Sequence, residues 1–85
     1  MFKYVKRISQ TEDMDNIQQQ GFYFKGYYRP INCPVMGSCM IEVWNFEGSI
    51  LQKIYVVTGG NIYIRGFIGG MWYNWFSVDT IEVQQ

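Results

Sequence analysis

The feature that most constrains this chain is its second half, where extended runs alternate with short glycine-containing segments. Four runs rich in β-branched and aromatic residues cover residues 39–46, 49–57, 62–68 and 71–78. The turns between them fall at Glu47-Gly48, at residues 58–61 and at Gly69-Gly70. Glycine supplies the positive φ that tight hairpin turns require. The pattern predicts an antiparallel β-meander of four or more strands.

Residue usage supports the same fold class. The 85 residues include seventeen Ile and Val and sixteen aromatic residues, against one Leu and no Ala, and β-branched and aromatic side chains are enriched in strands. A chain of this length has room for one core. We therefore expect a single, mainly β domain, with an N-terminal strand or arm in residues 1–12 and the β domain proper in residues 13–85.

The segment before the meander predicts less regular structure. Thr11, followed by Glu12 and Asp13, is typical of a helix N-cap with acidic residues in the first turn, and Gly21 would end such a helix. This predicts one short helix over about residues 12–19, with an irregular polar segment as the alternative, since two turns are marginal. Residues 22–28 then form a further aromatic strand, and the prolines in residues 29–34 indicate a loop.

Charge and side-chain chemistry exclude several classes of function. Seven basic residues balance seven acidic ones, so there is no basic field to attract nucleic acid. The chain has no His, which removes the commonest general base and a common zinc ligand. No apolar run is long enough to span a bilayer, and residues 1–10 lack the apolar block of a signal peptide. We expect no enzyme activity, cofactor, metal, nucleic-acid partner or membrane insertion.

Alternation along the runs predicts two apolar sheet faces. One face is expected to be aliphatic and the other aromatic with charges: Ile50, Ile54, Ile62, Ile64 and Ile68 against Tyr63, Arg65 and Phe67. Strict alternation over residues 71–78 places Trp72 and Trp75 on opposite faces. Neither face is polar enough to be freely solvated, which predicts that a second subunit covers one of them. The alternative is a monomer whose helix and residues 22–28 cover the second face.

Cysteines and carboxylates offer little for catalysis. Cys33 and Cys39 are compatible with a disulfide or with two ordinary thiols, and their spacing is not that of a zinc site. Two acidic pairs have the residue types of a glycosidase acid and base: Glu42 with Glu47, and Asp79 with Glu82. Spacing alone does not support them, and solvated or sheet-edge carboxylates are expected instead.

Aromatic side chains with one arginine among them are the best binding candidates. Aromatic rings stack on sugar rings and on guanidinium groups. The candidate ligand-binding residues are Tyr63, Arg65, Trp72, Tyr73 and Trp75, with Tyr27 and Tyr28 in the wider aromatic set. The alternative is that these residues build a core or a subunit interface.

An ordered series of short motifs runs through residues 13–78. In chain order it comprises Asp15-Asn16-Ile17, Gly21-Phe22-Tyr23, Asn32-Cys33-Pro34, Gly37 leading into Ile41-Glu42-Val43, residues 52–55, Tyr63-Ile64-Arg65 and Trp72-Tyr73-Asn74-Trp75. This series resembles the knob domain of phage tail fibres and of pyocin-type, phage-tail-like bacteriocins. The chain departs from the family pattern at Tyr73, where Ser is usual, and in the spacing of its Gly-x-Tyr element.

The resemblance implies a non-enzymatic virion component, made in the bacterial cytoplasm and assembled as a homotrimer in a tail or head fibre. Residues 13–85 would then be a knob-like β domain. The implied role is host attachment, in which weak stacking of a bacterial surface glycan on Trp75, Tyr73 or Tyr63 is multiplied by several copies. The alternatives are a purely structural module of the virion and an isolated carbohydrate-binding module. For Arg65 we predict stacking on Trp75 or pairing with a carboxylate.

Overall fold

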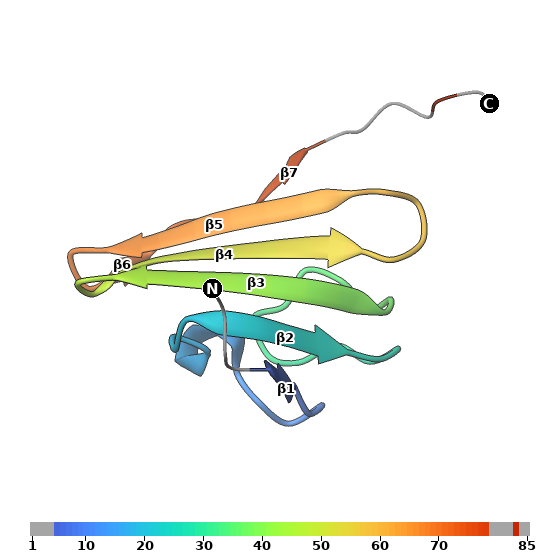
Figure 1. Ribbon diagram of the computed structural model, residues 1–85, viewed down its shortest axis with the longest axis horizontal. Helices are drawn as coiled ribbons and strands as arrows, with labels where there is room; N and C mark the ends of the chain where they lie inside the picture. Colours follow the sequence, from blue (N-terminus) through green and yellow to red (C-terminus); the bar gives the residue numbers. More distant parts are fainter. Residues whose placement is uncertain (1–4, 79–82, 84–85) are drawn as a thin grey trace.

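The predicted runs form one β-sheet in the computed structural model, which describes residues 5–78 and 83 (Figure 1). The strands are β1 (Val5–Arg7), β2 (Gly21–Lys25), β3 (Cys39–Phe46), β4 (Ser49–Val56), β5 (Ile62–Ile68), β6 (Met71–Trp72) and β7 (Phe76–Val78). The sheet order is β1-β2-β3-β4-β5-β6, and β7 also pairs with β5. All neighbours are antiparallel except β1, which runs parallel to β2. The mainly β, meander-like prediction is confirmed.

Each predicted glycine turn has the backbone that its residues favour. Glu47 and Gly48 have φ of 53° and 89°, and Gly69 and Gly70 have φ of 63° and 80°. Two successive residues with positive φ are the mark of a type I′ turn, whose twist matches that of the strands it joins. These two turns therefore fix the registers of the β3–β4 and β5–β6 hairpins.

The predicted helix over residues 12–19 is wrong. The structure has a single 3₁₀ turn, η1 (Met14–Asn16), and its N-cap is Asp13, whose carboxylate accepts the Asp15 N–H at 2.8 Å. The backbone N–H of Met14 donates to Ile31 at 2.9 Å, and that of Ile31 donates to Glu12 at 3.0 Å. The Glu12 carbonyl, which would accept the Asn16 N–H in a helix over residues 12–19, is thus used by a distant loop, so tertiary contacts override the local helix signal.

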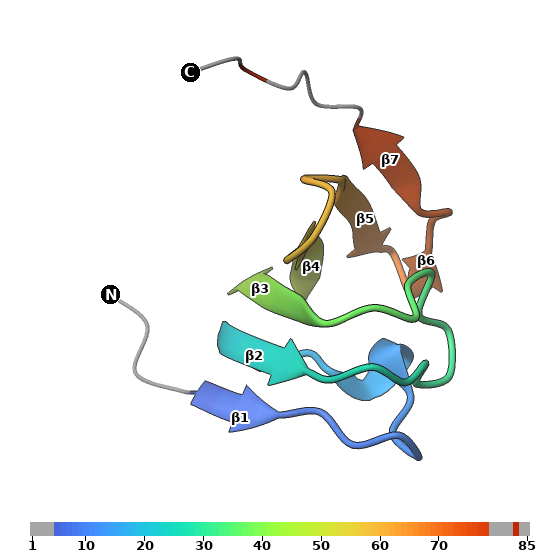
Figure 2. The same ribbon diagram turned by 90° about the vertical axis from the view of Figure 1, so that its right-hand side faces the viewer.

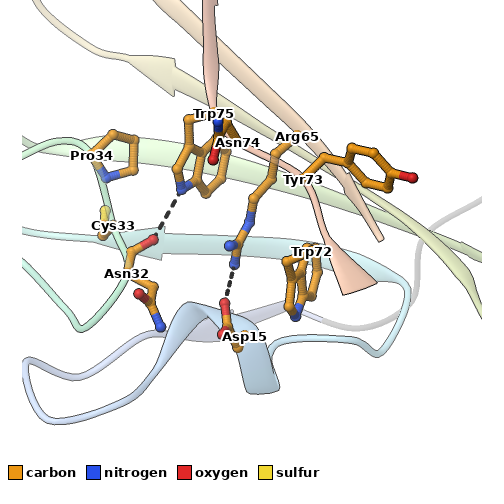
Figure 3. A pocket seen from close by; sticks show the side chains of 9 residues that line it. All are labelled: Asp15, Asn32, Cys33, Pro34, Arg65, Trp72, Tyr73, Asn74 and Trp75. Atoms are coloured by element: carbon orange, nitrogen blue, oxygen red, sulfur yellow. Dashed lines mark hydrogen bonds and ion pairs between the residues drawn. The ribbon is translucent and has the colours of Figure 1, made fainter. Parts of the chain in front are cut away.

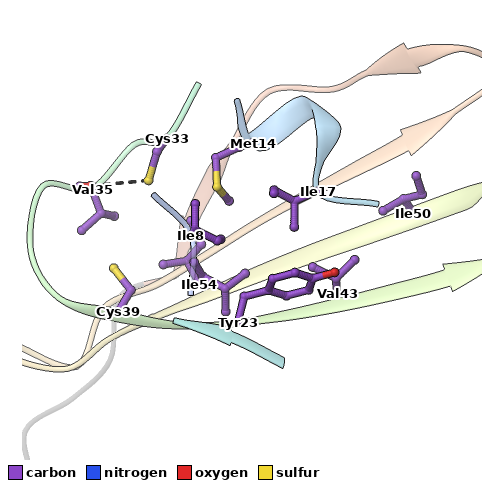
Figure 4. Packing of buried hydrophobic residues seen from close by; sticks show 11 residues of the cluster. Ile8, Met14, Ile17, Tyr23, Cys33, Val35, Cys39, Val43, Ile50 and Ile54 are labelled. Atoms are coloured by element: carbon purple, nitrogen blue, oxygen red, sulfur yellow. Dashed lines mark hydrogen bonds between the residues drawn. The ribbon is translucent and has the colours of Figure 1, made fainter. Parts of the chain in front are cut away.

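One face of the sheet, the inner face, carries the core. Figure 2 shows η1 and the loop between β2 and β3 on the same side of β2 and β3. The buried apolar side chains, most of them labelled in Figure 4, are Ile8, Met14, Ile17, Tyr23, Cys33, Val35, Cys39, Ile41, Val43, Ile50 and Ile54. The opposite side of the sheet is called the outer face below.

The predicted division into an aliphatic and an aromatic face is wrong. In the β4–β5 register Gln52 lies opposite Arg65 and Ile54 lies opposite Tyr63. The aliphatic side of β4 and the aromatic, charged side of β5 are therefore one and the same inner face. Ile62, Ile64 and Ile68 lie on the outer face instead, because strand pairing, which alternation within a run does not reveal, decides which sides coincide.

The predicted strand over residues 71–78 is interrupted. Trp72 pairs with Phe67 and Phe76 pairs with Ile64, so three residues, 73–75, lie opposite two on β5. This extra residue is a bulge, anchored by the Tyr73 N–H donating to the Gly66 carbonyl at 2.9 Å. The bulge resets the alternation and brings Trp72 and Trp75 to the same face, contrary to the prediction from strict alternation.

A buried lysine closes the end of β2. The Lys25 side chain is 3% exposed, and its ammonium donates to four backbone carbonyls, those of Gly26 (3.1 Å), Tyr28 (2.7 Å), Met36 (3.2 Å) and Gly37 (2.6 Å). The predicted strand over residues 22–28 therefore ends at Lys25. Its ammonium joins the turn after β2 to the loop before β3.

Candidate binding cleft around Arg65

Arg65 is the centre of a polar cluster on the inner face. Its side chain, 5% exposed, projects from the middle of β5. Its Nε donates to Gln52 Oε1 at 2.8 Å, and its Nη2 lies 2.9 Å from Asp15 Oδ1 (Figure 3). A buried guanidinium is stable only where such partners replace water, so Gln52 and Asp15 are the residues that allow Arg65 to be buried.

Two indole rings enclose the guanidinium. Arg65 Cζ lies 3.9 Å from the ring centroid of Trp72 and 4.6 Å from that of Trp75, and Figure 3 shows the side chain passing between them toward Asp15. Tryptophan is the best aromatic partner for a cation. The predicted stacking of Arg65 on Trp75 and its pairing with a carboxylate are both present, and the bulge adds Trp72.

Gln52 ties this cluster to the N-terminal segment. It is fully buried, and its amide Nε2 donates to the carbonyls of Met14 at 2.7 Å and Ile17 at 2.8 Å. The two carbonyls lie at the start of η1 and just after its end. Gln52 therefore places η1 where Asp15 can reach Arg65.

A second set of bonds holds the loop that faces η1. Trp75 Nε1 donates to the Asn32 carbonyl at 3.0 Å, and Asn32 Nδ2 donates to Asp13 Oδ1 at 2.8 Å. Asn32 has a φ of 62°, a conformation that Asn tolerates better than most residues. The loop, η1 and the β6–β7 bulge thus form one connected network.

Two groups of this network, Arg65 and Asp13, have shifted pKa values. Burial lowers the pKa of Arg65, while Asp15 opposes that shift, and the ordinary arginine value is so high that the guanidinium stays protonated. The hydrogen bonds from the Asp15 N–H and from Asn32 lower the pKa of Asp13. The cluster therefore contains a protonated guanidinium 2.9 Å from the Asp15 carboxyl group, with the Asp13 side chain beside it.

A cleft of about 390 Å³ opens beside the network. It is lined by Asp15, Asn32, Cys33, Pro34, Arg65, Trp72, Tyr73, Asn74 and Trp75. Its size falls in the range of small-ligand sites. Indole rings, two amides and a carboxylate are groups that hold a polar ring-shaped ligand by stacking and hydrogen bonding.

Of the five predicted ligand-binding residues, the structure brings four to this cleft: Arg65, Trp72, Tyr73 and Trp75. Trp72 and Trp75 are partly buried, whereas Tyr73 is 54% exposed and its ring points away from Arg65 in Figure 3. Tyr63 lies outside the lining. It shares the inner face of β5 with Arg65 but packs against the core.

Sequence reasoning left Asp15, Asn32 and Asn74 out of the site. All three belong to the short motifs that carry the family resemblance, and this was the signal that could have found them. Asp15 and Asn32 are brought to the site by contacts between segments far apart in the chain. Asn74 lies in the bulge, whose position depends on the pairing of β6 and β7 with β5.

The acidic pairs give no catalytic arrangement among the described residues. Of the two alternatives expected for the carboxylates, solvated or at a sheet edge, Glu42 does not take the second: it is a half-buried side chain of β3, inside the sheet, and accepts hydrogen bonds from Tyr55 (2.6 Å) and Trp44 (2.6 Å). The bond from Tyr55 is the main cause of a lowered pKa at Glu42, which opposes a role as general acid. Glu47 is exposed in a turn, and Asp79 and Glu82 lie outside the described residues.

The two cysteines are buried free thiols. Burial raises the pKa of both, and Cys33 donates to the Val35 carbonyl at 3.4 Å. A thiol with a raised pKa is a poor nucleophile. Of the two alternatives left open by the sequence, the structure has the pair of ordinary thiols.

The chain was compared with protein-family models, with curated proteins and with solved structures, and no match was found. Within residues 5–78 and 83, no helix has the length and apolar character needed to cross a membrane. The same part of the chain holds no group of three or more metal-ligating side chains.

Proposed function

We propose that this chain is a non-enzymatic phage virion component, a knob-like domain of a tail or head fibre that acts in attachment to the host surface or in fibre assembly. The observation that carries the proposal is the convergence at Arg65. Asp15, Asn32, Gln52, Trp72 and Trp75 come from four motifs of the family-like series, and all belong to the network around that one side chain.

In the attachment role, a bacterial surface glycan binds in the cleft beside this network. A sugar ring stacks on an exposed indole surface, and its hydroxyl groups bond to Asn74, Asn32 and Asp15. One such site is weak, and several copies on a homotrimeric fibre raise the avidity. The proposed location is therefore the virion, after synthesis in the bacterial cytoplasm.

The attachment role is tested with glycan arrays and whole-cell adsorption on a panel of bacteria. The variant Tyr73→Ala/Asn74→Ala changes two exposed residues at the cleft, and Tyr27→Ala/Asn61→Ala changes two exposed residues of the same types elsewhere. We expect the first variant to lose at least tenfold in binding and the control to bind as the wild type does. Equal binding by both variants, or no binding by the wild type, would reject glycan attachment.

A purely structural role in the virion is the second candidate, and the burial of Arg65 favours it. The side chain is 5% exposed and uses both indoles as intramolecular partners. In this case Trp75→Ala lowers the melting temperature and fibre assembly, while the two exposed cleft substitutions change neither. If the chain is instead an isolated carbohydrate-binding module, a monomer binds the glycan, and the two exposed cleft substitutions reduce that binding.

A further inference from the structure

The outer face of the sheet is apolar and exposed. Side chains from β2, β3, β6 and β7 contribute to it, with exposed fractions of 46% for Phe22, 57% for Met40, 76% for Phe46, 60% for Met71 and 68% for Phe76. The strand registers place them on one side, because one continuous row of paired residues crosses the sheet: Phe22, Glu42, Lys53, Ile64 and Phe76. Large contiguous apolar patches on small proteins mark interaction sites.

The polar groups in the middle of this face already have partners within the chain. Glu42 accepts from Tyr55 through one carboxylate oxygen and from Trp44 through the other, each at 2.6 Å. Lys53 pairs with Glu42 in the β3–β4 register, and its ammonium lies 5.5 Å from the Tyr55 ring centroid. Because buried polar groups are tolerated when they are hydrogen-bonded, this face can be covered without leaving the carboxylate unsatisfied.

The pattern of charge fits another copy of the same chain. Glu42 and Lys53 lie side by side on the two central strands, so a neighbouring copy can place its Lys53 over Glu42 and its Glu42 over Lys53. Such reciprocal pairing is the property of a two-fold interface, in which two identical subunits use the same patch. A strongly acidic or basic partner would meet one like charge in either orientation.

The area of the face is also sufficient. Six strand positions about 4.8 Å apart, with up to eight residues at about 3.3 Å each, span about 600 Å². Stable interfaces bury about 800 Å² on each partner, and projecting side chains raise the accessible area above that of the plane. One packed sheet pair is therefore within reach of a standard interface.

We propose that the outer face is the surface through which copies of this chain associate, with Met40, Phe46 and Phe76 in the contact and Glu42 and Lys53 paired across it. The contact is two-fold and joins two copies, so the proposal does not rest on the threefold fibre of the proposed function. The surface itself is argued from the sheet alone.

The first test is the mass of the complete chain by light scattering over a concentration series. We expect an oligomer for the wild type, a fall to the monomer mass for Met40→Lys and for Phe76→Lys, and the wild-type mass for Ile31→Lys. Ile31 is 55% exposed, close to the 57% of Met40, but is paired with Asp13 away from the sheet. A monomeric wild type, or an unchanged mass for both outer-face variants, would overturn the proposal.

A second test needs no variant. Met36 on the loop before β3 is 43% exposed, against 57% for Met40 and 60% for Met71. In the assembled protein, peroxide should oxidise Met40 and Met71 at least threefold more slowly than Met36, and dilution to the monomer should remove the difference. Oxidation of Met40 and Met71 as fast as Met36 in the oligomer would contradict the assignment.

These outcomes separate the inference from the function it extends. A dimer with protected Met40 and Met71 supports the two-fold surface and argues against the threefold fibre. A trimer would support the fibre and overturn the reciprocal pairing of Glu42 and Lys53, because a closed ring of three uses two different patches on each chain. If glycan binding or cell adsorption fails, protection of Met40 and Met71 from oxidation would still support the surface.

Discussion

Replacing Arg65 with methionine tests whether the network around it holds the fold together. Methionine keeps much of the apolar volume between the two indole rings but removes the charge and all donors. Gln52 Oε1, which accepts from Arg65 Nε at 2.8 Å, is then left buried without that donor. Asp15, whose side chain is 37% exposed, can return to water.

The expected loss of stability follows from these partners. A buried acceptor left unsatisfied costs about 1–3 kcal/mol, and two lost cation–π contacts add about 0.5–2 kcal/mol each. The ion pair adds at most about 1 kcal/mol because Asp15 is partly exposed, and relief of guanidinium burial offsets part of the total. We therefore expect a net destabilisation of about 3 kcal/mol, or about 15 °C in Tm for a domain of this size.

The assay is urea unfolding followed by tryptophan fluorescence, at one fixed protein concentration so that self-association does not differ between samples. Arg29→Met is the matched control, because Arg29 is exposed, and it should change stability by less than about 0.5 kcal/mol. Arg65→Lys should recover only part of the loss, since an ammonium lacks the planar fork of arginine. A loss below about 1 kcal/mol for Arg65→Met, or full recovery with lysine, would refute the reasoning.

Four other changes have definite expected outcomes. Glu47→Asn should stabilise the protein to urea by about 0.5–1 kcal/mol, because Asn accepts the positive φ of 53° in the first position of the turn; an unchanged or lower midpoint would contradict this. The lowered pKa of Asp13 contributes stability that is present above its unfolded pKa and is lost as pH falls through the folded value. Melting temperatures should therefore drop below about pH 4 and drop less in Asp13→Asn, whereas parallel pH profiles would argue against the cap. Cys33 and Cys39 should react with a thiol reagent at least tenfold more slowly in buffer than in urea, because both are buried and burial raises the pKa of each; equal rates would mean that the thiols are accessible. Lys25→Met should lower stability by about 2–3 kcal/mol through the loss of the ammonium from its carbonyl partners, and a wild-type urea midpoint would show that these bonds are dispensable.

Local chemistry was enough to predict the strands and their turns. The bounds of β3 and β5 coincide with the predicted runs, because Gly48 and Gly69 mark the turns in which they end. The helix over residues 12–19 failed because Asp13 caps a single turn that is tied to residue 31. Local sequence carries no record of that contact.

The site was predictable in its residue types but not in its arrangement. Aromatic residues near Arg65 indicated stacking, and Trp75 is stacked as predicted. Trp72 joins it only because the bulge shifts the alternation by one residue. Gln52 meets Arg65 through the β4–β5 register, and Asp15 reaches it through the bonds that Gln52 makes to η1. Such contacts between distant segments depend on the whole fold.

The ammonium of Lys25 stands where many proteins place a metal ion, amid carbonyl oxygens from two loop segments. Because this cation is part of the chain, it cannot dissociate from the carbonyl groups on dilution, and a chelator cannot remove it as it would remove a metal ion. The loop that it organises includes Cys33 and Pro34, which form one wall of the cleft. The shape of that wall therefore does not depend on a bound metal ion.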